Sequence, residues 1–503
     1  MNKSIFKSVL FLGLTYIVSS GVVIAETIPK ANNVGLPQNT PELKLNIPEP
    51  QLGKYRHVEA VTKDMPVIEV NEADLVNNPA LLERAMQSAV ASGNFPGIKV
   101  LLPVYRMWPQ HNEGLAKFAQ AVLAQSEGRV NEAVGLYREL VAAEPDAPML
   151  RFRMAQALFE DQQNEAAADQ FDRLQAESLP EVVREGIEHY RQALRERDAW
   201  QTYAGISVIR ESNINQAPQQ QYLGKYLEQN QCADAKAEDP NDDCYRGWRF
   251  DQPIDALALS YQAGADKKFS LSNGYYFKFT ADLSGKDYPS YSRYNDLTMR
   301  IGAGIGWADS RNDLGVIPFH ERRMYGNDAY SYTNGIRSYW NHWLLSNLQL
   351  ATVGEMSRLK NQQRERSDSK SHLIGISWMY YPSAKQYWLL GGDHYQERNP
   401  EDKSDSFNRY GVRAGLGYEW ASGLSGRAQV GYAKRRYQAP SFFSENDRRQ
   451  DSELAASISI WHRAVYFRGI TPRLTFSHQR NNSNDPFYTY QKNRLFVEFN
   501  KTF

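Results

Sequence analysis

The stretch from residue 297 to residue 307 reads LTMRIGAGIGW, and every second residue in it is apolar. The apolar positions are Leu297, Met299, Ile301, Ala303, Ile305 and Trp307, and between them stand Thr298, Arg300, Gly302, Gly304 and Gly306. Successive side chains of a β-strand point to opposite faces, so this segment has one apolar face and one small or polar face. Apolar side chains outside and small or polar ones inside are typical of a transmembrane β-barrel.

The same alternation recurs in later segments, at residues 410–420, 454–460 and 495–503. The last of them carries Leu495, Val497 and Phe499 on one face, and the sequence stops on Phe503. An alternating segment with an aromatic end resembles the C-terminal signal by which the barrel-assembly machinery receives outer-membrane proteins. We therefore expect residues 199–503 to form a barrel in outer-membrane lipid, with that machinery as a partner.

The composition agrees with a barrel and gives no support to a nucleic-acid partner. The 58 acidic and 58 basic side chains leave a net charge of zero, whereas nucleic-acid-binding domains are usually basic. Aromatic residues make up 12 % of the chain, and barrels place such residues in girdles at both membrane surfaces. At 503 residues the chain is also long enough for more than one domain.

Residues 1–25 have the features of a secretory signal peptide. Lys3 and Lys7 precede an apolar stretch, and small residues lead to a cleavage site between Ala25 and Glu26. A single membrane anchor is the alternative, because residues 8–25 carry no charge, but their polar middle weakens it. No later stretch of about 20 apolar residues follows, so further crossings would be made by strands. We expect the chain in the outer membrane of a Gram-negative bacterium.

The only two cysteines are Cys232 and Cys244, separated by a segment rich in Asp and Asn. In an oxidising envelope compartment we expect them to form one disulfide that closes a loop. A pair of metal ligands is the weaker interpretation, because no histidine lies between them.

Residues 26–70 are polar and rich in proline without periodicity, so we expect a flexible linker. Over residues 71–198 the period becomes helical and a repeat of 34 residues appears. Small residues and aromatics recur at this spacing, and a proline follows each unit; the positions are Ala121, Ala133 and Tyr137, then Ala155, Ala167 and Phe171. This is the tetratricopeptide (TPR) pattern, whose stacked helix pairs present a concave surface to a polypeptide partner. An ordinary helical bundle is the alternative.

Turn signals divide residues 200–503 into fourteen antiparallel strands, and the connections between them alternate in length. Short connections are expected at Lys267–Lys268, Asp309–Asn312, Ser346–Asn347, Pro382–Lys385 and Ser422–Gly423, and longer charged loops lie between them. Short turns of bacterial barrels face the periplasm and long loops face outward. An even number of strands returns the C-terminus to the side of the helices, which we therefore expect in the periplasm. The longest loop, about residues 213–252, carries both cysteines and is expected outside the cell or inside the pore.

No catalytic, cofactor-binding or metal-binding arrangement stands out. The three glycines at 302, 304 and 306 lack the Lys-Ser/Thr ending and the following helix of a phosphate-binding loop. Asp393 and His394 suggest an acid/base pair, but adjacent residues of a strand point to opposite faces. The other histidines show no ligand spacing. We therefore expect neither an enzyme nor a cofactor.

Several phrases carry a family resemblance. LYRELVAAEP at 136–145 and MAQALFED at 154–161 lie in the helical repeats, and SNINQAP at 212–218 follows the first strand. FRGITPRL at 467–474 and NSN at 482–484 lie late in the barrel. Together with the order of the domains, these phrases resemble the Slam family, the surface lipoprotein assembly modulators.

The resemblance implies a periplasmic TPR domain and a fourteen-stranded barrel that moves client lipoproteins, or secreted haem- or metal-binding proteins, to the cell surface. Its partners would be the client and periplasmic chaperones, and it implies no catalytic residue. The alternative is an exporter of polysaccharide or a solute pore, since TPR-plus-barrel arrangements also serve glycan secretion. An exporter of this kind should have a lumen biased to one charge sign. The charged positions expected in the lumen mix both signs but are somewhat basic, so they do not exclude export of an anionic glycan: Arg300, Arg413, Glu419, Arg427, Arg473 and Glu498.

Overall fold

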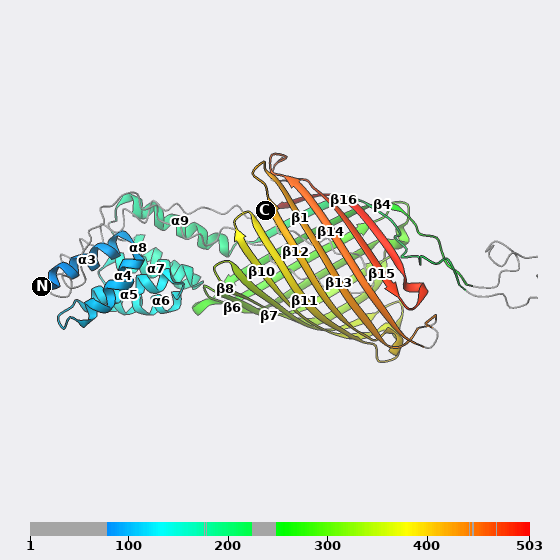
Figure 1. Cartoon of the computed structure of the whole chain (residues 1–503), viewed down its shortest axis with the longest axis horizontal. Helices are drawn as coiled ribbons and strands as arrows, with labels where there is room; N and C mark the ends of the chain where they lie inside the picture. Colours follow the sequence, from blue (N-terminus) through cyan, green and yellow to red (C-terminus); the bar gives the residue numbers. More distant parts are fainter. Residues whose placement is uncertain are drawn as a thin grey trace, which may run out of the picture.

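The computed structural model describes residues 78–503 except 176, 178, 224–247, 442, 445, 446 and 469. The expected signal cleavage site at Ala25 and Glu26, the linker of residues 26–70, and the pair Cys232 and Cys244 lie outside the described residues. The described chain has two parts, a helical solenoid and a β-barrel, which lie end to end (Figure 1).

The solenoid has seven described helices that pack in succession, as the TPR pattern predicts. None of the helices in the described part of the chain is long and apolar enough to cross a membrane. In chain order they are α3 (Pro79–Ser92), α4 (Phe95–Met107), α5 (Glu113–Ser126), α6 (Val130–Ala143), α7 (Pro148–Glu160), α8 (Asn164–Gln175) and α9 (Glu181–Arg197).

Asparagine side chains fix where the first three helices begin. The Oδ1 atoms of Asn78, Asn94 and Asn112 each accept a hydrogen bond from the backbone N–H three residues later, at 3.0–3.1 Å. These bonds satisfy one of the N–H groups that a helix leaves free in its first turn.

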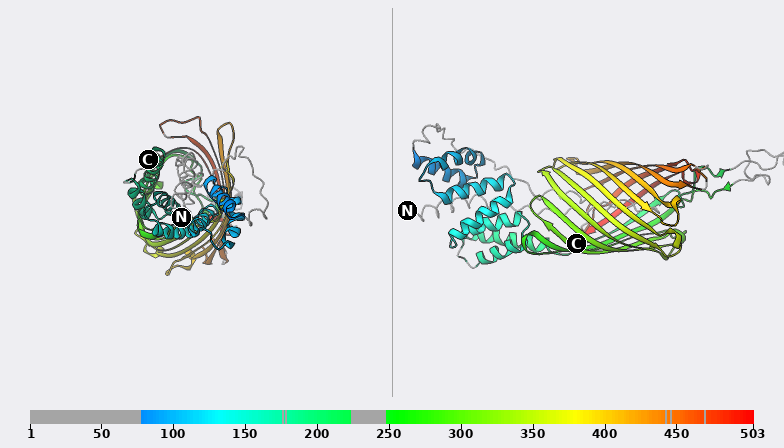
Figure 2. Two further views of the ribbon diagram at one scale, coloured as in Figure 1. Left: turned by 90° about the vertical axis from the view of Figure 1, so that its left-hand side faces the viewer. Right: turned by 90° about the horizontal axis from the view of Figure 1, so that it is seen from below.

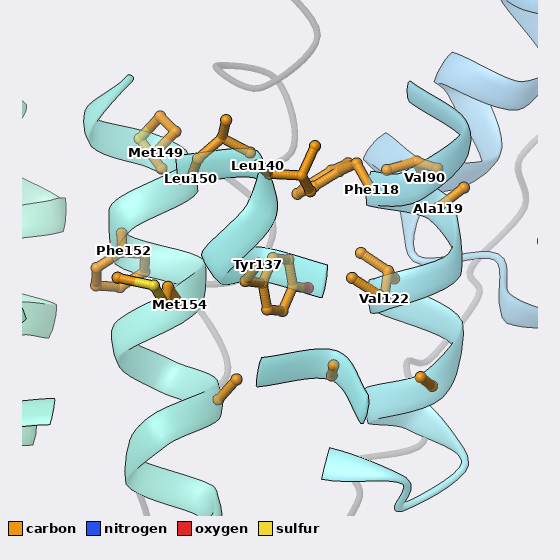
Figure 3. Close-up of a cluster of buried hydrophobic side chains, with 14 of the residues drawn as sticks. Val90, Phe118, Ala119, Val122, Tyr137, Leu140, Met149, Leu150, Phe152 and Met154 are labelled. Atoms are coloured by element: carbon orange, nitrogen blue, oxygen red, sulfur yellow. The ribbon is translucent and has the colours of Figure 1, made fainter. Parts of the chain in front are cut away.

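The residues of the 34-residue repeat lie in the solenoid core. The four alanines Ala121, Ala133, Ala155 and Ala167 are fully buried, which lets neighbouring helices approach closely. Tyr137 and Phe171 are also fully buried. Figure 3 shows Tyr137 lying between α5 and α7, with the labelled Val122 on one side and Phe152 on the other. The aromatic ring therefore fills the space between successive helix pairs, which a small side chain would leave empty.

The barrel is closed by fourteen antiparallel strands, which confirms the predicted fold class. A separate hairpin of β2 (Tyr222–Leu223) and β3 (Trp248–Arg249) lies in the long first loop. The barrel strands are β1 (Gln201–Glu211), β4 (Ala256–Ser270), β5 (Tyr275–Asp287), β6 (Asp296–Ala308), β7 (Asn312–Tyr325), β8 (Asp328–Leu345), β9 (Leu348–Asn361), β10 (Ser369–Ser383), β11 (Gln386–Arg398), β12 (Phe407–Glu419), β13 (Leu424–Pro440), β14 (Arg448–His462), β15 (Arg473–Ser483) and β16 (Tyr490–Thr502).

The first and last strands close the barrel. β1 pairs with β16 from Tyr203↔Thr502 to Glu211↔Arg494, and the backbone N–H of Phe503 donates to the carbonyl of Thr202 at 2.8 Å. The C-terminus therefore returns to the solenoid end, as the even strand number requires. Figure 2 shows the closed ring viewed from the solenoid end and the strands viewed from the side.

The two strand faces are divided as the alternation predicts. On β6, Ile301 and Ile305 point outward and are 54 % and 66 % exposed, whereas Gly302, Gly304 and Gly306 are buried. A Cβ on Gly306 would lie 2.2 Å from the Tyr276 ring, so glycine lets this interior tyrosine lie against the wall. At the chain end, Leu495, Phe499 and Phe503 are exposed on the outer face.

Connection lengths orient the barrel. At the solenoid end the connections have two to four residues, except for residues 463–472 between β14 and β15. At the other end they have six or more residues, except for a two-residue turn between β7 and β8. Short turns lie on the periplasmic side, so the chain is an outer-membrane barrel whose solenoid faces the periplasm.

One predicted turn was wrong. Lys267 and Lys268 lie inside β4, and the turn to β5 is made by residues 271–274. Lys268 faces the interior, where its Nζ lies 3.2 Å from Asp313 Oδ2. The turn instead uses Asn273 and Gly274, both with positive φ, which asparagine and glycine tolerate best.

Candidate functional site

The solenoid is attached to the periplasmic end of β4. Ser270 Oγ donates to Asp198 Oδ1 at 2.7 Å and accepts from Asn164 Nδ2 at 3.0 Å, and the Ser270 N–H donates to Asp198 Oδ2 at 3.4 Å. Nearby, Arg311 in the β6–β7 turn donates to the backbone carbonyl of Glu127 at 3.3 Å. The residues after α5 and α9 and the first residue of α8 therefore contact the end of β4 and the neighbouring β6–β7 turn, at one side of the barrel mouth.

Arg197 holds the end of α9 against α7 and α8. Its Nη1 donates to the Phe159 carbonyl at 2.8 Å and to Asn164 Oδ1 at 2.9 Å. Its guanidinium also stacks over the Phe159 ring, 3.5 Å from the centroid. The last helix is thus fixed to α7 and α8 immediately before the chain enters the barrel.

Two carboxyl groups near this junction have shifted pKa values. Burial raises the pKa of Glu160 to about 7, although a hydrogen bond from Gln125 and the charges of Arg153 and Arg197 oppose the shift. Burial also raises the pKa of Asp161, which a hydrogen bond from Gln163 opposes. The solenoid therefore carries a group that changes charge near neutral pH.

We predict that the solenoid loses stability as the pH rises through about 7. The folded-state pKa of Glu160 lies above its ordinary value, so its contribution is fully present in acid and is lost as the carboxyl group ionises in the folded state. Limited proteolysis of the full-length protein between about pH 5 and about pH 8 measures this loss. Glu160→Gln should flatten the profile, and Glu144→Gln, an exposed change after α6, should leave it unaltered. A profile that is identical in the wild type and in Glu160→Gln would contradict the assignment.

The barrel interior is lined by charged side chains of both signs that pair with each other. Arg300 on β6 lies 2.9 Å from Glu355 on β9. Across the lumen wall formed by β11 to β14, Arg409 bonds Asp393 at 2.6 Å and Glu453 at 2.9 Å. Such paired charges offer hydrogen bonds to many polar chains without favouring one charge sign.

A second interior cluster surrounds Glu211 at the outer end of β1. Its carboxylate lies 2.7 Å from Lys286 Nζ, 2.5 Å from Lys492 Nζ and 3.1 Å from Arg494 Nε. The Tyr288 hydroxyl also donates to it at 2.7 Å. All three cations and the carboxylate are buried, so this one anion holds β1, β5 and β16 together.

The segment after β1 folds back over the same three-strand region. The side chain of Asn213 donates to the carbonyls of Ala217 and Gln491, at 2.9 and 3.2 Å, and accepts from the Ala217 N–H at 2.7 Å. Ile214 is buried beside Ile209 of β1. The SNINQAP phrase therefore forms a compact turn that connects the outer ends of β16, β1 and β4.

Asp393 and His394, which suggest an acid/base pair in the sequence, point to opposite faces of the barrel wall. Asp393 bonds Arg409 and Arg413 inside the lumen, whereas His394 stacks on Tyr410 at 4.8 Å, and Tyr410 is exposed on the outer face. In the part of the chain that the structure describes, no group of three His, Cys, Asp or Glu side chains is arranged to hold a metal.

Sequence reasoning missed the Glu211 cluster. Counting back from Phe503 by alternation places Lys492 and Arg494 on the interior face, opposite Leu495. Counting along β1 from the interior Ser207 places Glu211 on that face too. The alternation of side chains along each strand therefore predicts that these residues face the interior. Their contact with each other depends on how the first and last strands pair when the barrel closes.

Comparisons with known proteins cover both parts of the chain. The family described as surface lipoprotein assembly modifier matches residues 200–503, and its N-terminal TPR repeats match residues 68–171. Surface lipoprotein assembly modifier 1 of Neisseria meningitidis serogroup B is 49 % identical over 95 % of this chain and 94 % of its own length. A surface lipoprotein assembly modifier of Moraxella catarrhalis is 42 % identical over 86 % and 82 %. The hemophilin secretion modulator of Acinetobacter baumannii is 26 % identical over 86 % and 88 %.

Proposed function

Because the chain belongs to the surface lipoprotein assembly modifier family, we propose that it is an outer-membrane translocon for client surface lipoproteins. A relative named for the secretion of hemophilin extends the proposed client class to secreted proteins. The proposal includes no catalytic step and no cofactor.

The observation that carries this proposal is the attachment of the solenoid to the barrel mouth. A stacked TPR surface holds a polypeptide, and the contacts of Asp198 and Asn164 with Ser270 would keep that polypeptide at the periplasmic entrance. The lumen wall beyond it carries paired charges of both signs, which suits a chain of mixed sequence better than a polymer of one charge sign.

We also propose a role for segments outside the described residues and for two further partners. The chain would be cleaved after Ala25, residues 26–70 would be a linker to the TPR domain, and Cys232 and Cys244 would form a disulfide in the outer loop. The barrel-assembly machinery would receive the segment that ends in Phe503, and periplasmic chaperones would deliver the client.

Deletion of the gene tests the proposed function. In intact wild-type cells, a lipoprotein encoded beside this chain should be digested by external protease, and in the deletion strain it should be present but protected. Return of the gene should restore digestion. A lipoprotein that is still digested in the deletion strain would contradict the proposal, and loss of a surface glycan with surface lipoproteins unchanged would favour an exporter.

A further inference from the structure

The last four residues of β16 have no partner on one edge among the described residues. Pairing of β16 with β15 ends at Glu498↔Arg473, whereas pairing with β1 continues to Thr502↔Tyr203. Residues 499–502 thus extend past β15 at the periplasmic rim, next to the strand pair that closes the barrel.

The direction of the backbone groups shows what this edge offers. The Phe503 N–H donates to Thr202 of β1, and backbone groups along a strand alternate between its two neighbours. The backbone N–H and C=O groups of Lys501 and Phe499 therefore also point toward β1. Those of Asn500 point the other way, to the place where β15 would continue. An edge with such free groups is a template for another extended chain.

Proline explains why β15 begins late. Thr471 and Pro472 precede its first residue, Arg473, and proline cannot donate to a strand ladder. Pairing of β14 with β15 accordingly ends at Trp461↔Arg473, so the gap beside β16 follows from the local sequence.

The connection between β14 and β15 is long and apolar. It has ten residues, whereas the other connections at this end have two to four. Val465, Tyr466 and Phe467 are consecutive and are 55 %, 65 % and 69 % exposed. Phe467 and Ile470 exchange two backbone hydrogen bonds, at 3.0 and 2.9 Å, which hold the connection in a tight turn. Three adjacent exposed apolar side chains on such a turn are typical of a contact surface.

β4 also extends past its neighbour at this end and provides a comparison. The last four residues of β4 have no partner on β1, since the pairing ends at Gln201↔Asp266. There the Ser270 N–H donates a hydrogen bond to Asp198 of the solenoid. The solenoid thus covers this unpaired edge, and only β1 separates it from β16.

We propose that the β16 edge at Asn500, together with the apolar turn of Val465, Tyr466 and Phe467, binds an extended segment of the client that adds to β16 as a short strand. The proposal rests on the proposed function and names its first binding site at the barrel. The segment would alternate apolar residues, directed toward Phe499 and Phe467, with polar residues directed toward the lumen. Its backbone would bond Asn500, so its exact sequence would matter little.

Site-specific photo-crosslinking in cells tests the contact. A benzophenone amino acid at Tyr466 or Phe467 of the full-length protein should crosslink to the adjacent-gene lipoprotein. The same group at Ala421, in the exposed β12–β13 turn of the same rim, should not. Crosslinks from Tyr466 and Phe467 to lipid alone would overturn the proposal, because they would place the turn in the membrane surface.

Matched proline variants test the strand edge. Asn500→Pro removes a backbone N–H that the barrel does not use and one side-chain hydrogen bond from Gln262. The barrel should still fold, while the client crosslink and the surface display fall about tenfold. Lys501→Pro removes an N–H that bonds β1 and should prevent barrel assembly. If Tyr466→Ser/Phe467→Ser with a folded barrel retains full display, the inference is wrong. If display also survives deletion of the whole gene, the proposed function itself has failed.

Discussion

Glu211→Gln is expected to prevent stable assembly of the barrel. The change keeps the shape of the side chain but removes the carboxylate that lies within 3.1 Å of Lys286, Lys492 and Arg494. All three cations are buried, so the change removes a negative charge that compensates for their lost hydration. Removing one partner of a buried ion pair costs about 3–5 kcal/mol. This loss falls on β1 and β16, the strands whose pairing closes the barrel.

The heat-modifiable migration of the folded barrel in gels measures this effect. The variant should lack the folded band and should have low abundance in the outer membrane. Glu419→Gln is the matched control, since Glu419 bonds Arg463 at an exposed site where an ion pair contributes about 1 kcal/mol or less. Normal folding of Glu211→Gln would show that the cluster does not hold the barrel closed.

Asp198→Lys combined with Asn164→Ala is expected to abolish surface display while both domains stay folded. The two changes remove the hydrogen bonds that join Ser270 to Asp198 and Asn164, and the first also reverses the charge at position 198. Hydrogen bonds to a charged group contribute about 1.5–3 kcal/mol each, and the remaining bond of Arg311 to the Glu127 carbonyl is long, at 3.3 Å. The solenoid should therefore detach from the barrel mouth. A client held on a detached solenoid would no longer be placed at the entrance.

Protease digestion of the surface lipoprotein on intact cells reads out this loss. The control is Asp172→Lys, which reverses an exposed charge on α8 that pairs with Arg191 inside the solenoid. The control should keep display and the folded barrel. Full surface display in the Asp198→Lys/Asn164→Ala variant would mean that delivery of the client does not require the solenoid to be attached to the barrel mouth.

The fold was predictable because alternation and a 34-residue repeat are local patterns. Ile301 and Ile305 point outward as their spacing requires, and the repeated alanines lie at the helix contacts. The turn at Lys267–Lys268 was mistaken because two adjacent charges resemble a turn, whereas Lys268 pairs with Asp313 inside the barrel. Local polarity cannot distinguish a charged lumen from solvent.

The functional features depend on contacts between distant residues, and these were not predictable in the same way. Glu211 and Arg494 meet only because the first strand pairs with the last in one register. The contact of Asp198 with Ser270 requires the solenoid to dock on a particular turn. The gap beside Asn500 reflects Pro472, whose effect on pairing appears only once both neighbours of β16 are known.

Reconstitution tests the central claim, that the solenoid passes a client through the barrel, most directly. Full-length protein is inserted into vesicles with its solenoid outside, and unfolded client lipoprotein is added outside. The account predicts that client becomes protected from external protease in vesicles with the wild-type chain and far less with the Asp198→Lys/Asn164→Ala variant. Client that stays equally sensitive in wild-type vesicles and in vesicles without protein, although the barrel is folded, would contradict the account.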